Sequence, residues 1–103
     1  MDMIKSTEEY DSLLKNETSL FVDFYADWCG PCKMAGPVLE ALSKVHTNVK
    51  FVKVNVDEHP DIAQRYGVMS IPTMIAFKNG QQTAMSLGFK PQEELEKIVQ
   101  AAE

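Results

Sequence analysis

The sequence predicts one α/β domain in which helices cover both faces of a mixed sheet. Its 103 residues are enough for one domain with a real core. Apolar side chains alternate between helical and strand spacing along the chain. The first strands are joined through helices, which predicts parallel pairing. Asn79-Gly80 is the favoured dipeptide of a hairpin turn, which predicts an antiparallel pair at the end.

The first half of the chain is predicted to fold as helix, strand and helix. Ser6 and Glu9 have the spacing of a capping box, so a helix is expected from there to about Lys15. Residues 20–25 are apolar or aromatic at five of six positions, which is typical of a strand covered on both faces. A second helix is expected from Pro31, with these apolar residues at helical spacing: Met34, Val38, Leu39, Leu42 and Val45.

The second half is predicted to fold as strand, helix, strand, strand and helix. Residues 49–56 place valines at alternate positions, which is a strand pattern. A short helix is expected to end at Gly67, because glycine readily adopts the left-handed conformation of a helix C-cap. Strands are expected over 73–77 and about 83–87, and Pro91 suits the first turn of a last helix.

Composition excludes several classes of function. The net charge is −5, and no cluster of Lys and Arg exceeds an isolated pair. Neither nucleic acid nor an anionic membrane surface is therefore an expected partner. The longest apolar runs are near strand length, far short of the ~20 residues that span a bilayer. The N-terminal residues, Met-Asp-Met-Ile-Lys-Ser, lack the apolar stretch of a signal peptide, so none is expected.

Two cysteines, Cys29 and Cys32, carry the strongest chemical signal. They follow a predicted strand and open a predicted helix, with Cys29 at the helix end. The unpaired N–H groups and the positive end of the helix dipole favour a thiolate at Cys29, and the thiolate is the nucleophilic form of cysteine. Cys32, one turn further in, is expected to be the more buried and the more protonated of the two.

Three interpretations of this pair compete. Zinc requires four ligands, and the chain has no second Cys-x-x-Cys, only the separate His46 and His59. Two inert core cysteines are poorly matched to a helix start flanked by Trp28, Gly30 and Pro31. A redox-active dithiol fits best, because Cys-x-x-Cys within a strand–helix–strand pattern is its expected context.

From about residue 3 to residue 99 the chain resembles the thioredoxin family. The resemblance rests on Trp28-Cys29-Gly30-Pro31-Cys32-Lys33, on Val-Asp-Phe-Tyr-Ala-Asp before it, and on segments 52–57, 66–68, 71–73 and 77–80 with Gly88. It implies a thioredoxin fold, with a central five-stranded mixed sheet flanked by four helices, as a single domain over residues 1–103. It also implies a thiol–disulfide oxidoreductase that binds no cofactor and works through a redox-active Cys29–Cys32 disulfide.

The resemblance implies a role for each of four residues. Cys29 would attack a disulfide of a target protein, and Cys32 would then attack Cys29 and release the reduced target. Asp23 lies within an apolar strand, so its pKa should rise, and as a general base it would help deprotonate Cys32 through water. Lys53 would lie near Asp23 and modulate that transfer. The structural alternatives are an Asp23 that faces water at a strand end and a Lys53 that snorkels on a sheet edge.

The resemblance also implies a surface that receives the target. Ile71-Pro72 would be a cis peptide bond beside the dithiol, leaving the Ile71 backbone free to pair with an extended target segment. An apolar patch around Cys29 would comprise Trp28, Gly30, Pro31, Ile71, Pro72, Gly88 and Phe89. Pro37 lies inside the second helix and removes a hydrogen bond to the Lys33 carbonyl, so it is interpreted as a structural bend without a catalytic role.

Three positions depart from the family's usual residues. Tyr25 stands where many members have a second Trp, Gly36 where Ala is common, and Phe89 where a small residue is frequent. None of the three belongs to the dithiol. Phe89 is expected to affect target choice or docking of a reductase, and Gly36 to loosen the helix next to Pro37.

Gly30 and Pro31, between the cysteines, indicate the direction of electron flow. Oxidising relatives tend to have a His there, which stabilises the thiolate and so the reduced protein. The absence of His favours a reductase of protein disulfides. Because no signal peptide is expected, this reductase is expected in the cytoplasm, and it is expected to be a monomer. The family implies that it is recharged by an NADPH-dependent flavoprotein, thioredoxin reductase. The alternatives are an oxidase or isomerase of the same fold and a non-catalytic binding subunit.

Overall fold

The computed structural model describes every residue from Met1 to Glu103. Its elements are β1 (Asp2–Met3), α1 (Thr7–Asn16), β2 (Ser19–Tyr25), α2 (Gly30–Val45), β3 (Lys50–Asn55), α3 (Pro60–Arg65), β4 (Thr73–Lys78), β5 (Gln81–Leu87) and α4 (Gln92–Gln100). The five strands form one sheet in the order β1-β3-β2-β4-β5. β1, β3 and β2 run parallel, and β4 is antiparallel to β2 and β5. The mixed sheet and four helices confirm the predicted fold class.

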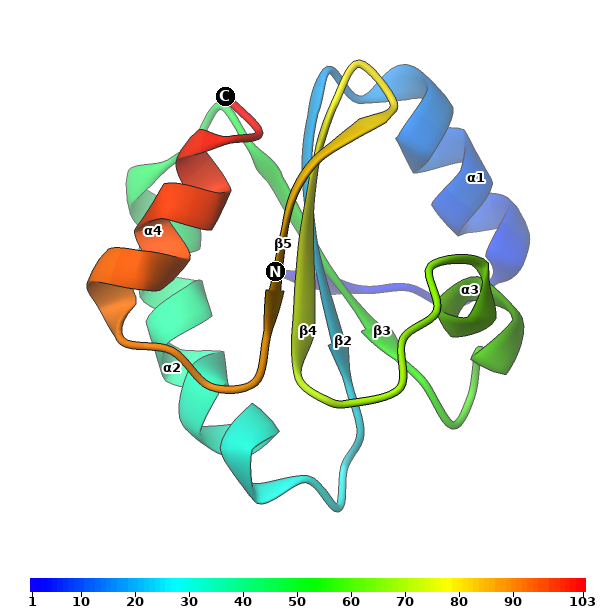
Figure 1. Cartoon of the computed structure of the whole chain (residues 1–103). Coiled ribbons are helices and arrows are strands. Elements are labelled where there is room, and N and C mark those ends of the chain that lie inside the picture. The colour runs from blue at the N-terminus through cyan, green and yellow to red at the C-terminus, as the bar shows by residue number, and fades with distance from the viewer.

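Helices cover both faces of the sheet, α1 and α3 on one and α2 and α4 on the other (Figure 1). Successive residues of a strand point to opposite faces, so β2 contributes to both cores. Val22 and Phe24 pack beneath α1 and α3, whereas Phe21 packs against Leu39 and Leu42 of α2. Asp23 shares the face of Phe21, and the sheet therefore directs its side chain towards α2.

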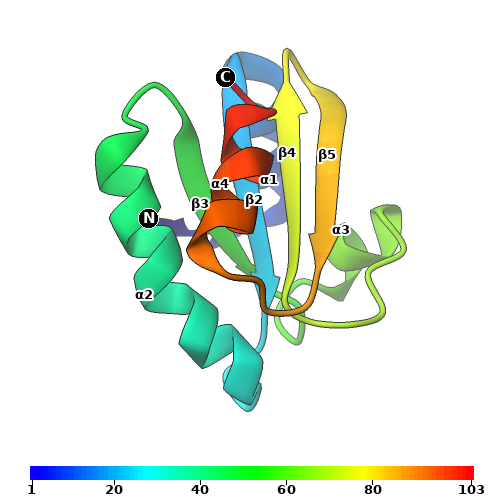
Figure 2. The ribbon, with the colours of Figure 1, turned by 60° about the vertical axis from the view of Figure 1, so that its left-hand side comes forward.

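The segments that carry the predicted site meet at one end of the sheet (Figure 2). There β2 leads into α2, the chain from α3 enters β4, and β5 leaves towards α4. The β4–β5 hairpin lies at the opposite end. Its turn residues Asn79 and Gly80 have φ of 52° and 77°, the left-handed pair that a two-residue turn of the predicted kind requires.

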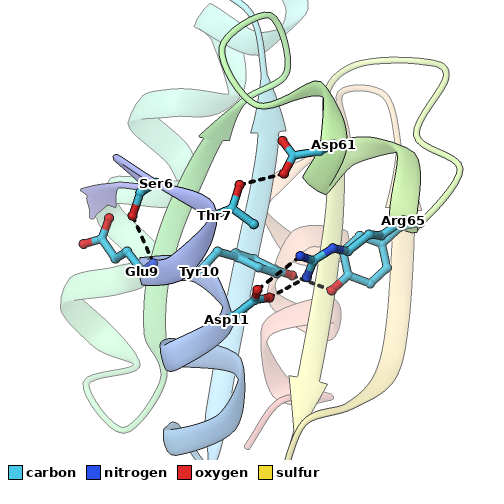
Figure 3. Close-up of polar contacts among 8 residues, drawn as sticks. Ser6, Thr7, Glu9, Tyr10, Asp11, Asp61 and Arg65 are labelled. Carbon is cyan, nitrogen blue, oxygen red and sulfur yellow. Dashed lines mark hydrogen bonds and ion pairs between the residues drawn. The ribbon is translucent and has the colours of Figure 1, made fainter.

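Polar contacts join α1 to α3 (Figure 3). Inside this interface the hydroxyl groups of Tyr10 and Tyr66 lie 2.8 Å apart. Ser6 caps α1 as predicted, its hydroxyl accepting from the Glu9 backbone N–H at 3.1 Å. The Glu9 carboxylate, however, accepts from the backbone N–H of Lys5 rather than from that of Ser6. Two exposed contacts are also drawn: Thr7 with Asp61, and Asp11 with Arg65.

Several sequence expectations about the elements were wrong in detail. β1 was not predicted, because two residues are too few to show a periodic pattern. Met34 and Val45 have the helical spacing of apolar residues that the sequence showed, yet their exposed fractions are 60% and 71%. The buried residues of α2 are Leu39 and Leu42, which the sequence analysis named, together with Cys32 and Ala35. Pro91 precedes α4 as its N-cap residue rather than lying in the first turn.

A candidate dithiol site at the start of a helix

Cys29 and Cys32 are joined in a disulfide across the first turn of α2, with their Cα atoms 5.3 Å apart. Cys29 is the N-cap residue, as the sequence predicts, and its Sγ accepts the backbone N–H of Cys32 at 3.2 Å. Both cysteines are buried, with exposed fractions of 4% for Cys29 and 6% for Cys32, so the expectation that Cys32 is the more buried is not confirmed. Once bonded, the two sulfurs share one small cluster with Ala26.

Trp28 is the exposed neighbour of the disulfide, with 71% of its surface accessible. Its indole Nε1–H donates to Asp57 Oδ2 at 2.8 Å, so the ring is tied to the segment that follows β3. Sequence reasoning did not select Asp57. A signal existed, because the carboxyl ends of parallel strands meet at one edge of a sheet, and Asp57 follows β3 as Trp28 follows β2.

Ile71 and Pro72 lie on the other side of the disulfide, and the peptide bond between them is cis. The Ile71 carbonyl oxygen is 3.7 Å from Cys29 Sγ. Gly88 donates its N–H to the Pro72 carbonyl at 2.7 Å and has a φ of 79°, a conformation that glycine adopts without strain. The structure thus brings Cys29, Ile71, Pro72 and Gly88 together. Pro72 itself is buried, so it supports the predicted apolar patch from beneath and adds little to its surface.

The other members of that patch reach the surface to different degrees. Gly30, Pro31 and Phe89 are exposed, and Ile71 and Gly88 are half-buried. Phe89 follows Gly88 just beyond the end of β5. Pro37 lies inside α2 as predicted, on an exposed part of the helix.

Asp23 lies within the sheet beneath α2, and only 4% of its surface is exposed. Its Oδ1 atom has no hydrogen-bond partner. Burial raises the pKa of this carboxyl from 3.8 to about 7, and the Lys53 ammonium opposes the rise only in part. The alternative of an Asp23 that faces water is therefore wrong.

Lys53 is the direct neighbour of Asp23 in the parallel pair of β2 and β3. β1 pairs on its other side, where Met3 is the register partner of Lys53, so the edge position considered for this lysine is also wrong. Its Nζ atom lies 5.1 Å from the centre of the Tyr25 ring, a cation–π contact. The Tyr25 hydroxyl in turn donates to Met3 Sδ at 3.1 Å.

One cavity of about 270 Å³ connects these groups, since Asp23, Lys53 and Cys32 all line it. The two histidines lie elsewhere. His46 contacts Glu96 and Glu103, at 2.8 and 3.1 Å, and both hydrogen bonds raise the pKa of its imidazole. No group of three or more His, Cys, Asp or Glu side chains is placed to hold a metal ion. No helix is both long and apolar enough to cross a membrane.

The disulfide lies at the N-terminus of α2, directly after β2, the central strand of the sheet. Two cysteines in this position are suited to thiol–disulfide exchange. Fold and site together define a thiol–disulfide oxidoreductase whose redox group is the Cys29–Cys32 pair itself.

Comparison with known proteins narrows this class. The family model for thioredoxin matches residues 2–101. A thioredoxin of Bacillus subtilis is 45% identical over 100 residues, covering 96% of both chains. A thioredoxin of Staphylococcus aureus is 45% identical over 101 residues, again covering 96% of both. A solved Plasmodium falciparum thioredoxin superimposes with a TM-score of 0.94 over 100% of both chains at 33% identity. The chain belongs to the thioredoxin family.

Proposed function

We propose that the chain is a general reductase of protein disulfides. The observation that carries the direction of electron flow is the Gly30-Pro31 pair between the cysteines, where there is no histidine. A His at this place would stabilise the Cys29 thiolate and with it the reduced protein, which makes a dithiol oxidising. Without it, the oxidised pair is relatively more stable, and the reduced protein gives up its electrons readily.

The reaction is two thiol–disulfide exchanges in sequence. The Cys29 thiolate attacks one sulfur of the target disulfide, a new bond forms to Cys29 Sγ, and the other target sulfur leaves as a thiolate. Cys32 then attacks Cys29 Sγ, the Cys29–Cys32 bond forms, and the second target sulfur is released. Two electrons pass to the target. The Cys32 backbone N–H, which points at Cys29 Sγ, supports this sequence because a donor at that sulfur favours a thiolate there.

Asp23 acts as the general base for the second exchange. The Cys32 thiol must lose its proton as it attacks, and Asp23 lines the same cavity as Cys32. A carboxyl whose pKa is raised to about 7 is suited to accept a proton near neutral pH. Lys53 modulates this step, because its charge favours the ionised form of Asp23.

Target binding uses the surface on both sides of Cys29. Trp28, Gly30 and Pro31 form one side, and Ile71, Pro72 and Gly88 form the other. An extended target segment would lie along Ile71, as in strand addition, with its disulfide over Cys29. The oxidised protein is recharged by an NADPH-dependent thioredoxin reductase, and the cytoplasm is the compartment in which we expect this cycle to run.

An equilibrium redox titration tests the proposal. Trp28 fluorescence is followed across dithiothreitol and glutathione ladders, with the Cys29→Ser variant as the control that should show no transition. A midpoint of about −270 mV, the value characteristic of thioredoxins as a family, is the expected result. A midpoint ~70 mV or more higher would instead indicate an isomerase or oxidase. No transition with both thiols intact would contradict the mechanism altogether.

A further inference from the structure

The side chain of Tyr25, the last residue of β2, reaches across two neighbouring strands. β3 lies next to β2 in the sheet, and β1 lies beyond β3. The Tyr25 hydroxyl donates to Met3 Sδ of β1 at 3.1 Å. Lys53 of β3 is the register partner of Met3, so it lies between the strand that carries Tyr25 and the strand that accepts its hydroxyl. The ring of Tyr25 therefore lies over Lys53.

Lys53 faces this ring with its charged end. Its Nζ atom is 5.1 Å from the ring centre, within the ~6 Å over which a cation is attracted to an aromatic face. Both side chains are half-buried, so water weakens the attraction less than it would at a fully exposed site. The ring thus gives the ammonium a defined position.

Lys53 has a second possible partner in Asp23. The two residues are register partners, and both line the cavity beside the disulfide. No ion pair joins them, however, and Asp23 Oδ1 has no hydrogen-bond partner. Lys53 therefore lowers the pKa of Asp23 only in part, and burial keeps it at about 7. An ammonium in direct contact would lower the pKa of a carboxyl by ~1–3.

We propose that Tyr25 is a positioning residue that holds the Lys53 ammonium away from Asp23 and so preserves the strength of Asp23 as a base. The inference rests on the proposed role of Asp23 in the second exchange. In that step Cys32 attacks Cys29 Sγ, the Cys29–Cys32 bond forms, the target sulfur leaves, and the Cys32 proton passes to the Asp23 carboxylate. An ammonium in contact with that carboxylate would stabilise it and make it a weaker acceptor of the proton.

Other ionisable groups lie around Asp23. They line the same cavity and come from α2, from the segment after β2 and from the N-terminus: Cys32, Lys33, Glu40, Asp27 and Met1. The Met1 amine contacts Glu40 at 3.1 Å. β4, on the other side of β2, places the uncharged Met74 beside Asp23. Lys53 is the one whose charge shifts the pKa of Asp23, so the test must remove Lys53 as well as the Tyr25 ring.

Tyr25→Leu and Tyr25→Phe test the proposal, because both remove the hydroxyl but only leucine removes the ring. Leucine also keeps apolar surface beside Asp23. Each change is made alone and together with Lys53→Met, which removes the ammonium. Tyr25→Met replaces Tyr25→Leu if thermal unfolding shows that the leucine variant does not fold.

Two measurements are made on each protein. The Asp23 carboxyl is titrated in the oxidised protein by carbon-13 NMR. The reduced protein is mixed with dithiobis(nitrobenzoate) between pH 6 and pH 8, and release of the first and second aromatic thiols is followed by stopped flow. The second release is intramolecular, so it is recognised by a rate that does not depend on the concentration of the reagent.

Tyr25→Leu should lower the pKa of Asp23 from about 7 to about 6 or below, because Lys53 is free to contact it. The second release should be about threefold slower at pH 8, where Asp23 is ionised in both proteins but is the weaker base in the variant. At pH 6 it should be at least as fast, because more of the variant's Asp23 is ionised. The first release should not change.

The control variants identify Lys53 as the intermediary. Tyr25→Phe should resemble the unmodified protein in both measurements, because it keeps the ring. When Lys53→Met is present, Tyr25→Leu should leave the pKa of Asp23 unchanged. A fall in this pKa that persists without Lys53 would overturn the proposal, because the ring would then act on Asp23 directly.

Asp23→Asn in the same assay separates this inference from the proposed function. If it leaves the second release unchanged at pH 8, the role of Asp23 as a base is wrong, and the slower release expected for Tyr25→Leu is wrong with it. If it slows that release while Tyr25→Leu and Tyr25→Phe give the same pKa of Asp23, the base is retained and the positioning role of Tyr25 is overturned.

Discussion

Asp23 is a single residue whose burial makes the stability of the protein depend on pH. Its pKa is 3.8 when unfolded and about 7 in the folded protein. Below pH 3.8 both states hold the proton, and no penalty arises. Between the two values the unfolded chain releases the proton while the folded one keeps it, so the free energy of unfolding falls as pH rises, by up to ~1.4 kcal/mol per pH unit. Above about 7 the penalty is constant.

The Asp23→Asn variant should therefore be more stable than the unmodified protein at pH 8. The expected gain is roughly 4 kcal/mol, because the two pKa values differ by about 3, and it should vanish towards pH 3.5. Urea denaturation of the oxidised proteins at pH 3.5, 5, 6.5 and 8 measures it. A gain that does not change with pH would show that Asp23 does not titrate between these values.

Trp28 offers a second prediction at the scale of one residue. Asp57→Ala removes the acceptor that holds its indole N–H, and the ring gains freedom. Restricting a mobile side chain costs ~0.5–1.5 kcal/mol on binding, so KM for a protein disulfide should rise about two- to tenfold. Stability should change by less than about 0.5 kcal/mol, as is usual for a surface position.

Fluorescence anisotropy of Trp28 checks the cause of the KM effect. It should fall in Asp57→Ala and stay nearly unchanged in Asp57→Asn, which keeps an acceptor oxygen. A rise in KM without a change in anisotropy would assign the effect to the lost charge of Asp57 instead.

Between elements, the contact of α1 with α3 combines a partly buried hydrogen bond with exposed ones (Figure 3). Tyr66→Phe leaves the Tyr10 hydroxyl unpaired in the core, which should destabilise the protein by ~1–3 kcal/mol. Asp11→Asn weakens an exposed ion pair with Arg65 and should cost less than ~1 kcal/mol.

Chemical denaturation of a double-mutant cycle tests this ranking. The pair Tyr10→Phe and Tyr66→Phe removes both hydroxyls and leaves no unpaired group, so it should cost less than the sum of the single changes. Additive losses would indicate that the two hydroxyls do not depend on each other.

The elements that could be predicted from sequence are those with local signals. The strand pattern of β2, the cysteine pair at the start of α2 and the Asn79-Gly80 turn each depend on residues close together in the chain. β1 could not be predicted, because its two residues become a strand only by pairing with β3. The burial of the two cysteines likewise depends on neighbours from distant segments, since Val56 and Ile71 pack against them.

The same distinction applies to the candidate site. The two cysteines and the buried Asp23 could be selected because their immediate sequence is unusual for their type. Asp57 looks like any acidic residue at the end of a strand, and only the parallel pairing of β2 with β3 brings it to Trp28. From the sequence, Gly36 was expected only to loosen α2, and only the folded structure shows that it lines the same cavity as Asp23 and Cys32.

For the whole molecule, opposing groups set the pH of greatest stability. Hydrogen bonds lower the pKa of several carboxyls, including Asp2, Asp11 and Asp61, and their contribution is complete above the unfolded value of 3.8. From that pH upward, Asp23 subtracts stability until about 7. The pKa of His46 is raised above 6.5 by Glu96 and Glu103, so its contribution is present below 6.5 and is lost as pH rises through the folded pKa.

Stability should therefore be greatest at about pH 4–5, below the range of about 5–8 that is common for proteins. Thermal unfolding of the oxidised protein between pH 3 and 9 locates the maximum. In Asp23→Asn the maximum should broaden towards pH 6.5, because only the loss from His46 remains on the alkaline side. A maximum above pH 7 in the unmodified protein would contradict the assignment of both groups.

The Asn79-Gly80 turn, at the end of the sheet away from Cys29, also matters for engineering (Figure 2). The ladder between β4 and β5 and the bond from the Asn79 N–H to the Thr18 carbonyl, at 2.7 Å, anchor both sides of this turn. Exposed loop tips of this kind accept inserted peptides. A recognition sequence spliced in here would extend away from the disulfide. Such a fusion could direct the dithiol chemistry to a chosen protein without altering the surface that performs it.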